Sequence, residues 1–167
     1  MHQGDFPGHT RRGTAASAHD ILLQDLDRHI QSPALRRVYQ HWRAALLRRS
    51  TPPSVESFRF GEDLREHVFV ATVRDNSLRF VSAGAVLTAC CRHMSVIDDV
   101  VEKVFGSPQA SYRACIEKEA PVYDYVRDTF GEKPVLCERL ILPFFGRGSR
   151  VTHLAGVLLL TELGPLH

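Results

Sequence analysis

Six residues in the second half of the chain carry side chains that could orient a small molecule. Ligand pockets are mostly apolar, with a few polar groups that set the orientation of the ligand. We expect such a pocket between a sheet and the helices predicted within residues 84–119. The candidate ligand-binding residues are Cys90, Tyr112, Tyr123 or Tyr125, Arg139 and His153.

Arg139 is the most informative of these candidates, because it lies inside a strand that is otherwise apolar. A buried guanidinium must be paired with a negative or hydrogen-bonding group. One interpretation is an ion pair with a structural acid such as Glu138 or Asp124. The other is an anionic ligand such as a carboxylate.

Two groups of residues could in principle serve an enzyme, and neither fits catalysis well. A nucleophile at Cys90 or Cys91 would need a base such as His93 within reach and a lowered pKa. Asp98 and Asp99 are adjacent, and adjacent carboxylates on a helix diverge rather than flank one substrate bond. We therefore predict that the protein is not an enzyme.

Metal and haem sites find little support in the sequence. The four cysteines show neither CxxC nor zinc-site spacing with histidine. Among the nine histidines, His93 is the best placed to ligate a haem, but there is no CxxCH attachment motif. We predict no cofactor and no metal, with a haem-binding sensor kept as an alternative.

Charge and hydropathy narrow the range of partners. The net charge is +2 over 167 residues, too small to indicate nucleic-acid binding. The longest apolar run is far too short to cross a bilayer, so no membrane insertion is expected. With no signal peptide apparent, we expect a cytoplasmic protein with reduced thiols.

The end of the chain predicts a hairpin around which the other elements must be arranged. Its strands are expected at Val135–Phe145 and Arg150–Leu160, joined by a glycine-containing turn. Both strands are apolar on both faces, so each face of the sheet needs a cover. Pro143 cannot donate to a ladder, which predicts an edge position or a bulge there.

An amphipathic helix is predicted from Ser32, a capping residue, and Pro33 to about Arg49. Its apolar face could cover one side of the sheet, either within the same chain or in a partner chain as a homodimer. The predicted interface residues are Leu35, Val38, Trp42 and Leu46. A shorter helix is expected before it, over residues 20–31.

Periodicity and turn signals predict the remaining elements. Strands are expected at 66–74, 78–82 and 120–127, and helices at 84–92, 95–105 and 109–119. The domain organisation that follows is a disordered tail at 1–17, a helical cap at 18–49, a linker at 50–65 and one domain at 66–162.

This order of elements, together with several stretches of sequence, resembles the PAS domain. Residues 33–160 resemble in particular the single-domain PAS proteins common in alphaproteobacteria. The landmarks are PALRRVYQHWRAALLRRSTPP, then LRFVSAGAVLTACCR, and then APVYDYVR followed by ERLILP, a glycine turn and a last strand. The stretch CCRHMSV departs from the pattern, because it lacks an expected glycine.

The resemblance implies an α+β fold, a five-stranded antiparallel sheet with short helices enclosing a cavity on one face. The N-terminal helices would cap the other face. It also implies a non-enzymatic sensory role, often as a dimer. The flavin photosensors of this fold carry a GxNCRFLQ-like motif, and CCRHMSV shares only Cys91 and Arg92 with it. We therefore expect no flavin–thiol photocycle.

The function that these observations predict is a cytosolic PAS sensory or regulatory module. It would bind a small molecule or a partner protein and signal by protein association. A ligand-free interaction scaffold with a fully packed core is the alternative from a different class.

Overall fold

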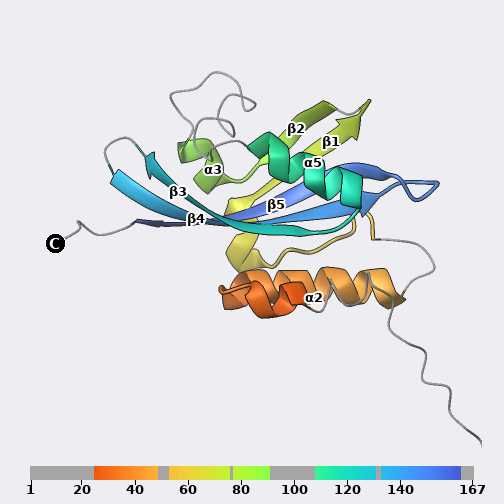
Figure 1. The fold of residues 1–167 in the computed structure, drawn as a ribbon, viewed down its shortest axis with the longest axis horizontal. Coiled ribbons are helices and arrows are strands. Elements are labelled where there is room, and N and C mark those ends of the chain that lie inside the picture. The colour runs from red at the N-terminus through yellow and green to blue at the C-terminus, as the bar shows by residue number, and fades with distance from the viewer. Residues whose placement is uncertain (1–24, 49–52, 76, 91–107, 131–132, 163–167) are drawn as a thin grey trace, which may run out of the picture.

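The computed structural model describes residues 25–48, 53–75, 77–90, 108–130 and 133–162. One antiparallel sheet forms the middle layer, with a long helix on one face and shorter helices on the other (Figure 1). The fold is therefore α+β, as the sequence predicted.

The sheet has five strands in the order β2-β1-β5-β4-β3, and every neighbouring pair is antiparallel. The last strand of the chain thus lies at the centre, between the first strand and the fourth. The strand bounds are β1 Val68–Arg74, β2 Ser77–Ala83, β3 Val122–Phe130, β4 Lys133–Phe145 and β5 Val151–Glu162. All five strands were predicted from the sequence, with ends that differ by at most three residues.

The two faces of β4 are both buried, which confirms the prediction drawn from its apolar pattern. Leu140, Leu142 and Phe144 belong to the core on one face, whereas Cys137 and Ile141 belong to the core on the other. Successive side chains of a strand point to opposite faces, so each core receives every second residue.

Pro143 takes the edge position that the sequence predicted. The ladder between β3 and β4 ends at Ile141, so Pro143 pairs only with Leu154 of β5. A register shift follows between Phe144 and Phe145. This shift turns Phe145 toward the same core as Phe144, where plain alternation had predicted the opposite face.

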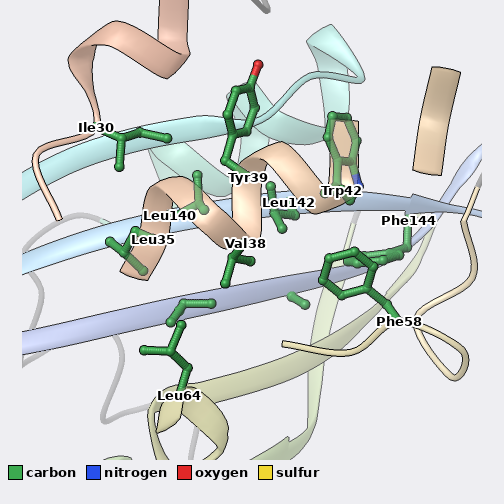
Figure 2. Close-up of a cluster of buried hydrophobic side chains, with 12 residues drawn as sticks. Ile30, Leu35, Val38, Tyr39, Trp42, Phe58, Leu64, Leu140, Leu142 and Phe144 are labelled. Carbon is green, nitrogen blue, oxygen red and sulfur yellow. The ribbon is translucent and has the colours of Figure 1, made fainter. Parts of the chain in front are cut away.

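Helix α2, Pro33–Arg48, covers one face of the sheet. Its side chains Leu35, Val38 and Trp42 are buried against β4 and β5 (Figure 2), and Leu46 packs beside them. Trp42 is fully buried, and its Nε1 donates a hydrogen bond of 3.0 Å to the carbonyl oxygen of Pro143. This face of the sheet is therefore covered by the helix of the same chain, which was one of the two arrangements predicted from the sequence.

The described part of the predicted linker, residues 53–65, adds to the same core. Phe58 contacts Phe144 edge to face, with ring centroids 5.3 Å apart. The 3-10 helix η1, Glu62–His67, places Leu64 beneath the sheet. The segment is therefore part of the packed structure that underlies α2.

Helices α3, Ala85–Cys90, and α5, Pro108–Lys118, lie on the opposite face. Their side chains Leu87, Tyr112 and Cys115 form a second core with the sheet. Gly156 of β5 makes room there, because a Cβ atom at this position would lie 2.0 Å from the ring of Phe69.

Several predicted segments lie wholly or partly outside the described residues. They are the tail at 1–17, the helix at 95–105 and the stretch around His93. The helix predicted at 20–31 is helical at residues 25–29. The division into cap, linker and domain stays a prediction.

Candidate functional site

A polar cluster borders the apolar core beneath α5. Arg139 of β4 is 2% exposed and faces its cross-strand partner Asp124 of β3. Its Nε donates to Asp124 Oδ1 at 2.8 Å, and its Nη2 donates to Asp124 Oδ2 at 2.6 Å. This bidentate geometry is the strongest pairing available to a guanidinium. The structure thus contains the ion pair with a structural acid that the sequence left as one of two interpretations.

Ser111 of α5 connects the helix to this ion pair. Its hydroxyl donates to Asp124 Oδ2 at 2.7 Å and accepts a hydrogen bond from Arg139 Nη2 at 3.0 Å. Ser111 was not predicted from the sequence, because one serine in an amphipathic helix gives no signal of its own. The one signal near it was the adjacent candidate residue, Tyr112.

Tyr112 lies beside the same guanidinium. Its ring centroid is 5.6 Å from Arg139 Cζ, and its ring contacts Phe69 and Phe80 edge to face. The Tyr112 hydroxyl and Arg139 Nη1 are both buried, and neither has a hydrogen-bond partner among the described residues. Since buried polar groups are nearly always paired, these two atoms mark the cluster as unusual.

The protonation states of the cluster follow from burial and charge. Burial alone would lower the pKa of Arg139, but the hydrogen bonds and charge of Asp124 raise it above its ordinary value. Burial raises the pKa of Tyr112 well above its usual range, although the Arg139 charge opposes this. At neutral pH the Arg139 guanidinium is therefore charged and the Tyr112 phenol is protonated.

Tyr123 and Tyr125 belong to the opposite face of the sheet. The Tyr123 hydroxyl lies 2.7 Å from Glu138 Oε1 and 2.7 Å from the Tyr125 hydroxyl, and it accepts a hydrogen bond from the backbone N–H of Gln31. Glu138 also accepts from the backbone N–H of Ser32, at 2.8 Å. These tyrosines therefore hold the start of α2 and do not share the site with Arg139.

His153 is also separated from Arg139 by the sheet. It neighbours Leu154, which belongs to the α5 core, so its own side chain points to the α2 face. There its ring nitrogen Nδ1 lies 3.1 Å from the Thr152 hydroxyl. The side chain of Cys90 is outside the described residues, as are Cys91, His93, Asp98 and Asp99. Of the six predicted residues, Tyr112 and Arg139 therefore lie together on the α5 face, and Tyr123 and Tyr125 lie together on the α2 face.

Within the described ranges, the side chains provide neither a metal site nor, at Cys115, a reactive thiolate. No group of three or more His, Cys, Asp or Glu side chains there could hold a metal ion. Cys115 is fully buried, and burial raises the pKa of its thiol well above the ordinary value, which keeps it protonated. None of the described helices is long and apolar enough to cross a membrane.

No known protein family matches this chain, and no curated protein does. The solved structures similar to it include a light-oxygen-voltage domain studied with a flavin analogue, with a TM-score of 0.46 and 10% identity over 62% of this chain and 82% of that one. A cysteine-to-serine mutant of Vivid has a TM-score of 0.46 and 11% identity over 72% of this chain and 97% of that one.

An RNA-binding light-oxygen-voltage receptor has a TM-score of 0.44 and 13% identity, over 84% of this chain and about half, 54%, of the receptor. At these scores and identities the likenesses carry no information about a cofactor or a partner of this chain. The predictions of no cofactor and of no nucleic-acid partner stay predictions.

The order and arrangement of the strands and helices identify the type of fold. A five-stranded antiparallel sheet with short helices on one face and an N-terminal helix on the other is the arrangement that the sequence resemblance implied. The chain has a PAS-like fold.

Proposed function

We propose that this protein is a non-enzymatic PAS-type sensory module that binds a small molecule on the α5 face of its sheet. The observation that supports this is the polar cluster of Ser111, Asp124 and Arg139 beside the apolar core of the α5 face. A few convergent polar groups among apolar side chains are typical of ligand sites. The α2 face is covered by α2 of the same chain, which favours the α5 face as the ligand site in this proposal.

Signalling would occur by protein association, because the proposal includes no catalytic step. A homodimer and a separate signalling protein are the partners that we propose. Leu35, Val38 and Trp42 are already packed against the sheet of the same chain. A dimer would therefore form through another surface, or after α2 leaves the sheet. A cytoplasmic location belongs to the same proposal.

The ligand-free scaffold is the second candidate, and one observation favours it. The charge of Arg139 is already balanced within the chain by Asp124, so no ligand is needed to neutralise it. In that case the α5 face would act as a packed core, and the protein would act only through its surface.

Native mass spectrometry of the freshly purified full chain, with an absorption spectrum of the same sample, tests the proposal. We expect a bound species of defined mass that is absent after unfolding and refolding. The same protein, stripped in this way, should then be stabilised against heat by at least one compound of a metabolite panel.

A chain that carries nothing and that no compound stabilises would contradict the sensory function and favour the scaffold. A strong Soret band would instead identify the haem-binding alternative.

A further inference from the structure

Two buried hydrogen-bond donors beneath α5 have no acceptor among the described residues. Arg139 uses Nε and Nη2 for Asp124 and Ser111, which leaves the two N–H groups of Nη1. The Tyr112 hydroxyl is the second donor. Both side chains are 2% exposed, and neither atom has a partner among the described residues. Burying such groups without an acceptor destabilises a protein, so an acceptor from a bound molecule would stabilise both of them.

The charge at the site limits what this acceptor can be. The Asp124 carboxylate contacts the guanidinium through both of its oxygens, so the Arg139 charge is balanced before any ligand arrives. An anionic ligand would add a second negative charge close to Asp124 in a poorly solvated place, where repulsion between like charges is strong. A neutral acceptor, such as a carbonyl oxygen, would meet no such repulsion.

The surroundings of the two donors limit the rest of the ligand. The Tyr112 ring contacts Phe69 and Phe80 with ring centroids 5.8 and 6.2 Å away. The other members of this core are apolar or sulfur-containing, namely Leu87, Cys115, Cys137, Ile141, Leu154 and Leu158. A group that lies among these side chains must itself be apolar, because they offer few hydrogen bonds.

We propose that Arg139 Nη1 and the Tyr112 hydroxyl form a subsite for a neutral carbonyl compound with an apolar or aromatic body. The proposal rests on the ligand-binding function proposed above and specifies the chemical class of the ligand. It replaces the anionic ligand that the sequence had suggested for Arg139.

Three probes of similar shape test the subsite on the full chain after ligand removal. Acetophenone supplies a neutral carbonyl, benzoate supplies a carboxylate, and ethylbenzene supplies no acceptor. Molecules of this size bind weakly, so binding is measured by nuclear magnetic resonance titration at millimolar concentrations. We expect acetophenone to bind about tenfold more tightly than the other two probes, and to shift the backbone signals of Tyr112 and Arg139.

The variant Tyr112→Phe separates a ligand contact from a structural role. Without a probe, its melting temperature should equal or exceed that of the parent, because the removed hydroxyl has no partner in the described chain. With acetophenone, its affinity should fall several-fold. The matched control is Tyr125→Phe, which removes a hydroxyl from the α2 face and should leave acetophenone binding unchanged.

The possible failures are distinguishable. Acetophenone binding no better than ethylbenzene, or benzoate binding most tightly, would overturn the carbonyl subsite while the ligand-binding function stands. The subsite is also overturned if Tyr112→Phe lowers the melting temperature of the ligand-free protein by more than about 2 °C, because the hydroxyl would then be paired within the chain. No binding by any probe, with no response to the metabolite panel, would overturn both proposals.

Discussion

Glu138 and Arg139 are consecutive residues of β4, and their side chains bind to opposite layers of the molecule. Glu138 Oε1 accepts the backbone N–H of Ser32, at the start of α2. Arg139 reaches the other face, where it binds Asp124 and, through Nη2, Ser111 of α5. One dipeptide thus connects the N-terminal helix to the proposed ligand site, because neighbouring residues of a strand face opposite ways.

Replacing Trp42 by alanine tests the α2 face. We expect Trp42→Ala to lower the free energy of unfolding by about 3–5 kcal/mol, since a fully buried ring is removed from a packed core. Chemical denaturation of the full chain measures the change. Trp42→Phe is the matched control, which keeps an aromatic ring but loses the hydrogen bond to Pro143. A loss below about 1 kcal/mol for Trp42→Ala would show that the ring is not part of the core.

Glu138 provides a test of how α2 is held at its first turn. Glu138→Ala removes the acceptor of the Ser32 N–H and of the Tyr123 hydroxyl, so we expect a loss of about 1–3 kcal/mol. Glu138→Gln keeps an acceptor oxygen and loses only the favourable charge near the helix N-terminus, a loss of about 0.3–1 kcal/mol. Amide hydrogen exchange in residues 33–48 should accelerate more in Glu138→Ala. Equal exchange in both variants would contradict this role.

Asp124→Asn should cost considerable stability, because it leaves the charge of Arg139 buried without a counter-charge. Breaking a buried ion pair typically costs about 3–5 kcal/mol. We expect a loss at the lower end of this range, because the Asp124 side chain is 26% exposed and water therefore weakens the ion pair. Denaturant unfolding measures the change.

The double variant Asp124→Leu/Arg139→Leu is the control for that measurement, because replacing both partners by apolar groups is often close to neutral. It should be more stable than Asp124→Asn alone. If Asp124→Asn cost less than about 1 kcal/mol, the charge of Arg139 would not depend on Asp124.

Stability should fall as the pH rises above about 9. Burial raises the pKa of Cys115 from an ordinary value of 9.0, and burial raises the pKa of Tyr39 from 10.0 to about 12. Above the ordinary values the unfolded chain loses these protons while the folded chain keeps them. Each group then lowers the unfolding free energy by at most about 1.4 kcal/mol per pH unit. Below about pH 9 their contribution is fully present.

The variant Cys115→Ala isolates one of these contributions. Denaturant titrations between about pH 8 and 11 should show a shallower fall for Cys115→Ala than for the parent, because one group that ionises only on unfolding has been removed. An identical slope in both proteins would mean that the Cys115 thiol ionises in the folded state.

The strands and helices of the described residues, apart from η1, could be predicted from the sequence. Apolar residues on both faces of β4 and β5 predicted a sheet with two covers, and the stripe of Leu35, Val38 and Trp42 predicted one of those covers. Turn residues and proline placed the ends of elements to within a few residues. The apolar periods and turn residues could be recognised because each involves only residues close together in the sequence.

Which polar side chains meet depends on strand register and on how the helices pack on the sheet. A slip of one residue in register moves a side chain to the other face of a sheet, and the sequence does not state the pairing of β3 with β4. That register placed Asp124 opposite Arg139, and it placed Tyr123 and Tyr125 on the α2 face with Glu138. The pairing of β5 with β4 placed His153 on the α2 face with Phe144, and the packing of α5 on the sheet brought Ser111 to Asp124. The candidate site therefore follows from strand register and helix docking, which depend on contacts between residues far apart in the chain.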